Sequence, residues 1–375
     1  TMSVTLNDIA ARVQCSPATV SRAMNGTASV EETLRVRILA AMEELETQAN
    51  GDKAESKKGR PRGSVSLSDT IDVVLFRNEG IEPLCYSDQG LKVASITDED
   101  PHAFFSPRLK LSTDFYRSII DGIIEELYKV GLQMRQQICR DLLDERFINR
   151  LNKSRHRGVL LLGSPDKTVK DFIHRCSLPV VLVDILGIPD VPVVAVDNLG
   201  GITLALRHLL SLGHKRIGFA GNNDNPGLQI RYLAFCGGMT GAGLVVKQDW
   251  CLLAAEHIKD VVKKYTKILS SPNRPSAVIC ANDCYAIGVM SAAAAAGLSI
   301  PKDLSVVGFD DVDVAALLTP PLTTVRVPKT EIGACAADLL LHCTGNGGLL
   351  GLWNHCEVRC RTELVVRGST RHQHD

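Results

Sequence analysis

The chain has 375 residues, of which 45% are hydrophobic, and this is enough for two or three domains with sizeable cores. Its 42 basic and 42 acidic residues balance, so no global field favours a polyanionic partner and any nucleic-acid contact must be local. The longest apolar stretches, such as 158–163 and 289–298, are too short for a bilayer, which argues against a transmembrane protein.

The N-terminal sequence TMSVTLNDIAARVQ lacks the features of a signal peptide, so we expect a cytoplasmic protein. Most of the twelve cysteines lie in apolar runs, where reduced cysteine behaves as a small core side chain. Two pairs have i, i+4 spacing, Cys280 with Cys284 and Cys356 with Cys360, and His355 adjoins the second. Because there is no CxxC pair and no second ligand cluster, we expect neither a metal site nor a cofactor.

Residues 4–50 read as three short helices. Leu6, Ile9, Ala10 and Val13 have helical spacing, and a break at Gln14-Cys15 precedes a second helix. Ser16 suits the N-cap of that helix and Pro17 its first turn. The third helix starts near 30–32 and places apolar side chains on one face, namely Leu34, Ile38, Ala41, Met42 and Leu45.

Residues 49–69 change composition to ANGDKAESKKGRPRGSVSLSD, with charge, glycine and serine but no large apolar side chain before Val65. This predicts a linker, and its five cations between Lys53 and Arg62 make it the locally basic part of the chain. A solvated tether is the simpler interpretation of the same composition.

The remainder alternates apolar strands with amphipathic helices, which predicts an α/β core of parallel, doubly wound sheets in two lobes. The predicted domains are therefore an all-α head at 1–49, a basic linker at 50–70 and a two-lobed core at 71–375. Residues 78–112 interrupt the alternation as an extended insertion, either a lid or a partner surface.

Short polar side chains follow three predicted strands: Asp184 after PVVLV, Asn282 with Asp283 after AVICA, and Asp310 with Asp311 after SVVGF. Ligands of open parallel sheets bind beyond the carboxyl ends of the strands. Carboxylates and amides there suit the vicinal hydroxyls of a sugar or nucleoside, although each could merely cap the next helix. No GxSxG nucleophile motif and no phosphate-binding glycine loop is present.

The head is more specific, because a helix, a short turn and a second helix can place the second helix in the DNA major groove. Hydroxyls of the segment SPATVSR can hold phosphates or base edges, a small alanine can approach a thymine methyl, and Arg22 can reach guanine. Val20 would face the core of the head. A small protein-interaction bundle is the alternative.

These stretches resemble the LacI-type family of transcriptional regulators. VTLNDIAARVQCSPATVSRAMNGTASVEETLRVRILAAMEEL is similar to its DNA-binding head. VVAVDNLGGITLALRHLLSLGHKRIGFAG, AVICANDCYAIGVMSAAAAAGLSIPKDLSVVGFDD and LLTPPLTTVRVP resemble its effector-binding core. The resemblance implies a homodimer that binds operator DNA, with a periplasmic-binding-protein-like core that takes a small molecule. We expect DNA contacts from Thr5, Ser16, Pro17, Ala18, Thr19, Ser21, Arg22, Asn25, Arg60 and Arg62.

The resemblance also places effector contacts on five residues: Asp184, Arg231, Trp250, Asn282 and Asp310. These types fit carbohydrate, since arginine can fork two hydroxyls and tryptophan can stack on the C–H face of a sugar. Val327 and Leu162 stand where some sugar-binding members have polar side chains, which indicates a less hydroxylated ligand or contacts from elsewhere.

The linker departs from the family pattern. Members usually have an alanine-rich hinge helix here, with a leucine that enters the minor groove, and this chain has neither. Its GRPRG, residues 59–63, resembles the core of an AT-hook, whose arginines favour narrow A·T-rich minor grooves. We predict that Arg60 and Arg62 replace the leucine wedge.

The sequence thus predicts a DNA-binding transcriptional regulator, most simply a repressor, controlled by a sugar-like effector. The rival classes are an exported solute-binding protein with the same core and a sugar-metabolising enzyme. The missing signal peptide and the head argue against the first, and the missing acid/base or nucleophile set against the second.

Overall fold

The computed structural model describes residues 6–16, 19–20, 34, 37–38, 41, 69–76, 110–163, 167–223, 226–253, 258–344 and 356–373. The chain divides into two compact units, 1–65 and 66–375, which are described separately. No described helix is both long and apolar enough to cross a membrane.

In the head, α1 spans Leu6–Val13 and ends where predicted, at Gln14, whose φ of 56° breaks the helix. Ser16 caps the second helix as predicted, because its hydroxyl accepts a 3.1 Å hydrogen bond from the Thr19 backbone N–H. Val20 is buried, with Ile38 beside it, in a small apolar cluster whose other buried members are Ala10, Val13 and Ala41.

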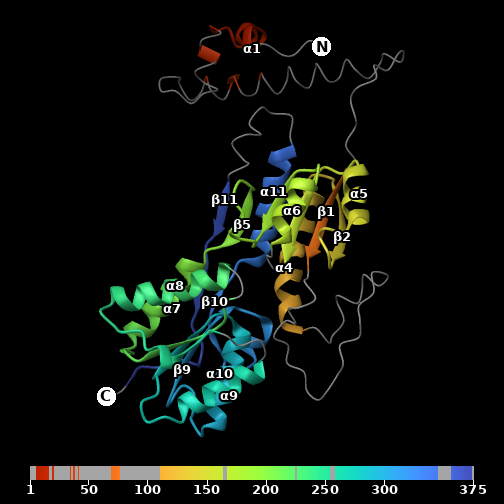
Figure 1. Ribbon diagram of the computed structural model, residues 1–375. Coiled ribbons are helices and arrows are strands. Elements are labelled where there is room, and N and C mark those ends of the chain that lie inside the picture. The colour runs from red at the N-terminus through yellow and green to blue at the C-terminus, as the bar shows by residue number, and fades with distance from the viewer. Residues whose placement is uncertain are drawn as a thin grey trace. The chain divides into compact units, whose positions relative to one another are not determined.

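The second unit contains two six-stranded sheets: all strands of the first are parallel, and the second is parallel except at one edge (Figure 1). In lobe A the order is β11 (Glu357–Cys360), β5 (Val193–Val196), β4 (Val180–Val183), β3 (Val159–Gly163), β1 (Thr70–Phe76) and β2 (Gln133–Cys139). In lobe B it is β12 (Glu363–Val365), β10 (Thr323–Arg326), β9 (Ser305–Asp310), β8 (Ala277–Cys280), β6 (Ile217–Ala220) and β7 (Cys251–Leu252). The antiparallel pair is β10 with β12.

Helices cover both faces of each sheet, as the continuous apolar strands predict. One face of lobe A packs against α4 (Lys110–Lys129) and α11 (Lys329–Thr344), and the other against α5 (Glu145–Lys153) and α6 (Thr168–Arg175). Lobe B carries α7 (Asn198–Ser211), α8 (Pro226–Gly241), α9 (Ile258–Leu269) and α10 (Asp283–Ala295). The fold class predicted from the sequence is confirmed.

Glycine lets α4 and α11 touch through their backbones. A Cβ on Gly333 would lie 1.9 Å from the Ile119 carbonyl oxygen, and one on Gly122 would lie 2.0 Å from that of Thr330. The two helices therefore form one rigid layer on lobe A.

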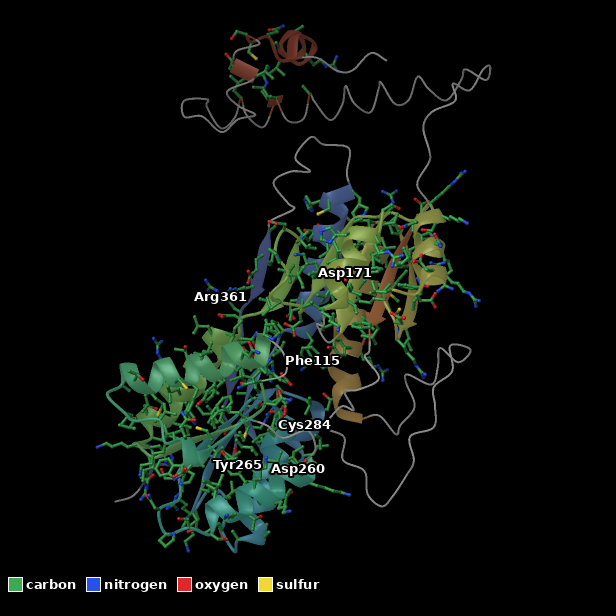
Figure 2. All side chains as sticks on the ribbon, viewed as in Figure 1. Phe115, Asp171, Asp260, Tyr265, Cys284 and Arg361 are labelled. Carbon is green, nitrogen blue, oxygen red and sulfur yellow. The ribbon has the colours of Figure 1, made fainter. Side chains whose placement is uncertain are left out.

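Within the described residues, the chain passes between the lobes after β5, after β10 and after β11 (Figure 1). Arg361, labelled in Figure 2, lies in the third of these passages, between β11 and β12. The carboxyl ends of the central strands in both sheets face the boundary between the lobes, and this brings the predicted site residues together.

Four elements of lobe A were absent from the sequence prediction, namely β2, α5, α11 and β11. The strand β2, QMRQQIC, is polar because it is an edge strand with only partial burial. The helix α5 has apolar residues only on one narrow stripe, Phe147, Ile148 and Leu151. The predicted insertion at 78–112 lies outside the described residues except for the start of α4.

Candidate functional site

Four of the five predicted effector residues lie at the lobe boundary. Asp184 directly follows β4 of lobe A, while Asp310 ends β9 and Asn282 follows β8 in lobe B. Arg231 reaches the same place from α8. We call these four residues the cleft cluster.

Arg231 is the centre of the cleft cluster and is itself buried. Its Nε donates to Asn198 Oδ1 at 2.7 Å, and its Nη1 donates to the Ala281 carbonyl and, at 3.3 Å, to Asp310 Oδ1. The guanidinium lies 3.7 Å from the centre of the Phe309 ring, a cation–π contact. No described residue accepts a hydrogen bond from Arg231 Nη2, so the N–H groups of this nitrogen remain available to a ligand.

Asp184 contributes a carboxylate from the opposite lobe. Burial raises its pKa to about 6, which the neighbouring Arg231 charge and a hydrogen bond from Val196 N–H oppose. Burial likewise raises the pKa of Asp310, with Arg231 and Lys329 acting against it. Since each carboxylate is influenced by Arg231, groups of both lobes share one electrostatic environment.

The backbone at these positions has unusual dihedral angles. Asp184, Asp310 and Asp311 have φ values of 56°, 106° and 49°. Residues other than glycine rarely adopt positive φ, and such conformations concentrate at binding sites. Lys329 stabilises the turn, because its Nζ donates to the carbonyl oxygens of Asp310 at 2.5 Å and Asp311 at 3.1 Å.

Asn282 performs the capping role that the sequence also allowed. Its side chain accepts a 3.0 Å hydrogen bond from Tyr285 N–H at the start of α10. Its neighbour Asp283 is fully internal: its two oxygens accept hydrogen bonds from Thr324 Oγ1 and Val312 N–H, at 2.5 and 2.9 Å. Burial, with Asp310 nearby, raises the pKa of Asp283 to about 8.

The structure does not bring Trp250 to the cleft cluster. It precedes β7, at the amino end of that strand, and its indole N–H donates to the Asn273 carbonyl at 2.9 Å. Lys247 covers the buried ring at 4.5 Å. The ring of Trp250 therefore lies at the end of the lobe B sheet opposite the cleft cluster, so it is not placed to stack on a ligand bound there.

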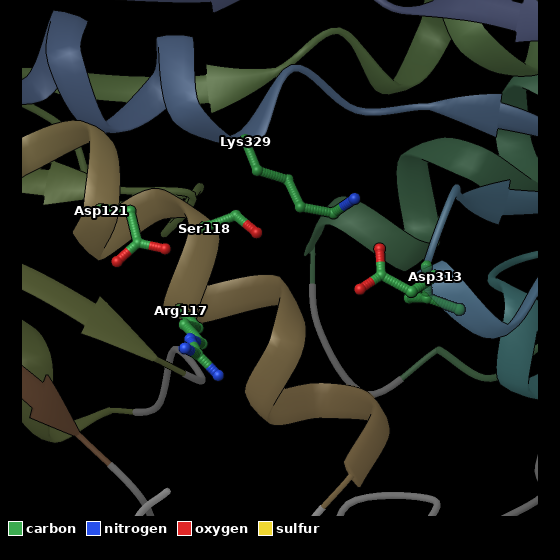
Figure 3. A pocket seen from close by; sticks show the side chains of 6 residues that line it. Arg117, Ser118, Asp121, Asp313 and Lys329 are labelled. Atoms are coloured by element: carbon green, nitrogen blue, oxygen red, sulfur yellow. The ribbon is translucent and has the colours of Figure 1, made fainter.

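A pocket of about 330 Å³ lies beside this site, between the middle of α4 and η3 (Asp313–Ala316) (Figure 3). Its lining is mostly polar and comes from Arg117, Ser118, Asp121, Val312, Asp313 and Lys329. Phe115, one turn earlier on α4, lies where the lobes meet (Figure 2). The two apolar departures from the family pattern, Val327 and Leu162, are buried in the core.

Sequence reasoning missed three contributors: Asn198, Phe309 and Lys329. Asn198 follows the N-cap of α7, and Phe309 precedes the flagged Asp310, so strand-end position was a usable signal for both. Lys329 had no local signal, because β10 and the turn to α11 bring it to Asp310 only in the fold.

Of the predicted DNA contacts, the structure describes Ser16 and Thr19, whose hydroxyls are 2.8 Å apart at the start of the second helix. Thr5, Pro17, Ala18, Ser21, Arg22, Asn25, Arg60 and Arg62 lie outside the described residues. Among the described residues, no group of three or more His, Cys, Asp or Glu side chains could hold a metal ion.

The two units together define a class: a helix-turn-helix head joined to a two-lobed core with a polar site between the lobes. Residues 5–50 match the family model "Bacterial regulatory proteins, lacI family", and residues 206–370 match "Periplasmic binding protein-like domain". The chain is 28% identical to the repressor CytR of Escherichia coli K12, covering 98% of this chain and 97% of that one. It is 27% identical to the ribose operon repressor of the same strain, with coverage of 90% and 92%.

A solved complex of the transcriptional regulator CelR with cellobiose has a TM-score of 0.65 and 25% identity, covering 98% of this chain and all of that one. The lac repressor dimer bound to operator shares the fold, with a TM-score of 0.61 and 21% identity over 98% and 99%. The chain belongs to the LacI family of bacterial regulatory proteins and is a DNA-binding transcriptional regulator.

Proposed function

We propose that this regulator is a repressor controlled by an uncharged, hydroxyl-rich small molecule, a sugar or sugar derivative, bound between its lobes. The observation that carries the proposal is the approach of Asp184 from lobe A to the Arg231–Asp310 pair of lobe B. A ligand that forms hydrogen bonds to both lobes binds one arrangement of the lobes better than the others. This difference in affinity is required for the ligand to shift the equilibrium between the arrangements.

The charges of the cleft cluster favour a neutral ligand over an anionic one. Two carboxylates, Asp184 and Asp310, accompany a guanidinium that already pairs with one of them. Hydroxyl groups can donate to these carboxylates and accept from Arg231 Nη2, whereas a phosphate would meet like charge. The names of similar proteins, a ribose operon repressor and a regulator complexed with cellobiose, agree with this class.

A thermal-shift panel of neutral sugars, nucleosides, sugar acids and sugar phosphates tests the proposal. A ligand at a hundred times its dissociation constant stabilises the core by about 2.7 kcal/mol. We expect neutral compounds to stabilise the protein and Asp310→Asn to abolish the shift. Asp313→Asn is the matched control, since this exposed residue lines only the neighbouring pocket. Stabilisation by sugar phosphates alone would contradict the proposal.

The head, in this proposal, reads operator DNA with the residues named from the sequence, including Ser16 and Thr19. A homodimer is expected because paired heads match two half-sites. The end of α4 supplies a candidate dimer surface: Ile124 and Tyr128 on the helix and Val130 just after it are exposed apolar side chains, and Tyr128 is 83% exposed. A repressor acts on the chromosome, so the proposal also places the protein in the cytoplasm.

For the linker we propose minor-groove contact by Arg60 and Arg62 at the centre of the operator. Operator sites are obtained by selecting bound duplexes from a random library. The variant Arg60→Ala with Arg62→Ala is expected to lose preference for A·T pairs at the centre while keeping the outer half-sites. An unchanged central preference would reduce the linker to a tether.

A further inference from the structure

The edge of lobe A opposite the cleft has a cationic segment that no part of the proposed function uses. Residues 150–157, RLNKSRHR, form the end of α5 and the turn into β3. They contain Arg150, Lys153, Arg155 and Arg157 together with a histidine, and no acidic residue. We call this segment the 150–157 surface.

The cations of this surface are largely available to a partner. Arg150, Lys153 and Arg155 are exposed, and within the described part of the chain no carboxylate pairs with Lys153 or Arg155. Arg157 forms a 3.2 Å ion pair with Asp69, which is itself 73% exposed. In a chain with no net charge, this is a local positive field.

A buried carboxylate holds the surface in place. Asp72 of β1 is fully buried and accepts 2.7 Å hydrogen bonds from Arg135 Nε, Gln137 Nε2 and His156 Nδ1. Gln137 Oε1 in turn accepts from Arg150 at 3.2 Å. The turn 154–157 is therefore fixed to the sheet, and its cations are preorganised for a ligand.

Helix-dipole stabilisation accounts for only part of this charge. Arg150 and Lys153 occupy the last turn of α5, where cations are favourable against the negative helix end. Arg155 and Arg157 follow the C-cap residue Ser154 and lie beyond the range of that effect. Arg155 therefore has neither this stabilisation nor a carboxylate partner among the described residues, and Arg157 has only the exposed Asp69.

The position in the chain indicates which partner. Asp69, which pairs with Arg157, follows Arg62 of the linker by seven positions. Seven residues span at most about 25 Å, so a linker arginine in a minor groove brings this edge of lobe A near the duplex. The polyanion within reach of the 150–157 surface is then the DNA backbone.

We propose that the 150–157 surface of the core contacts DNA phosphates when the head and linker are bound. The contact rests on the proposed DNA-binding function and adds sequence-independent affinity, because phosphate contacts carry no base information. Lys153 and Arg155 are the principal contributors, and Asp72 acts as a positioning residue.

The test compares the parent with two double variants of the full-length protein. Lys153→Gln with Arg155→Gln removes the two exposed cations of the 150–157 surface that pair with no described carboxylate. Lys215→Gln with Lys302→Gln is the matched control, since both lysines are exposed in turns at the amino ends of strands in lobe B. Affinity is measured from low to moderate salt on the selected operator and on a mixed-sequence duplex of 40 base pairs, roughly four helical turns.

The lobe A variant is expected to weaken binding to both duplexes by about tenfold near 0.1 M salt, and to lower the slope of log K against log salt by about 2 per protomer. The control variant should bind both duplexes with the affinity and slope of the parent. The lobe A variant should select the same operator sequence as the parent, because phosphate contacts carry no base information. A lobe A variant with the parent's affinity and slope overturns the inference, even where specific DNA binding is intact. A parent that binds no duplex would instead refute the proposed function.

Discussion

Two buried carboxylates, Asp72 and Asp283, show how differently the two edges of this core treat the same chemical group. Asp72, near the amino end of β1, receives hydrogen bonds from Arg135, His156 and a glutamine amide. Asp283, at the cleft edge of lobe B, receives them from a hydroxyl and a backbone N–H, with Asp310 close by. The first is paired with a guanidinium, whereas the second has only neutral donors among the described residues.

The comparison teaches that burial alone does not decide what a carboxylate does. The groups that donate hydrogen bonds to the Asp283 carboxylate are neutral, so they do not fully offset its desolvation and the pKa of Asp283 rises to about 8. A cationic shell instead turns Asp72 into an anchor that presents arginines at the surface. One edge thus suits an uncharged ligand, while the other suits a polyanion.

The largest expected effect is on the pH dependence of stability. Because the folded-state pKa of Asp283 is raised to about 8, the native protein keeps a proton that the unfolded chain loses near pH 4. Its contribution is therefore full at low pH and is lost as pH rises towards about 8, by up to about 1.4 kcal/mol per pH unit. Asp283→Asn should flatten the decline in the unfolding midpoint between about pH 5 and pH 8.

The control for this experiment is Asp171→Asn, because Asp171 is exposed on α6 of lobe A. It should reproduce the pH profile of the parent. A parent whose stability rises over this pH range would show that the neutral shell of Asp283 does not hold a proton.

Removal of the anchor at the other edge is expected to have the next largest effect. Asp72→Ala leaves Arg135 and His156 beside a buried gap, and losing one partner of such a cluster costs about 3 kcal/mol. Urea unfolding should register that loss, and Asp171→Ala should leave the midpoint unchanged. If Asp72→Ala unfolds like the parent, the cationic shell does not stabilise lobe A.

The smallest expected effect sharpens the role of Arg231. Arg231→Lys keeps the charge but loses the fork that bonds Asn198 and Asp310 together. Titration calorimetry with a ligand found by thermal shift should show affinity reduced about tenfold, near 1.4 kcal/mol. Arg274→Lys, on the surface loop before β8, is the control. An unchanged affinity would show that Arg231 holds Asn198 and Asp310 together but does not contact the ligand.

Much of this architecture could be predicted from the sequence. The break at Gln14, the Ser16 cap and the burial of Val20 follow from local patterns, and the structure confirms all three. The apolar runs of the central strands likewise predicted the two parallel sheets. Local chemistry was sufficient because caps and buried strands are specified by neighbouring residues.

Other features needed contacts between distant segments. Trp250 resembles a ligand-stacking residue by type, yet strand register puts it at the amino end of β7, against Asn273. The polar strand β2 gave no apolar signal, and Asp72 looks like an ordinary charged residue within β1 until Arg135 and His156 meet it.

The sequence by itself determined the family, the helix-turn-helix head and the delivery of Asp184, Asn282 and Asp310 to strand ends, because these depend on motifs and on periodicity. Only the tertiary structure decided which groups meet. It paired Arg231 with Asp310, set Trp250 apart, and assembled a cationic surface around Asp72. The physical reason is that hydrogen bonds and ion pairs act over a few ångströms, often between residues far apart in the chain, such as His156 and Asp72, which are 84 positions apart.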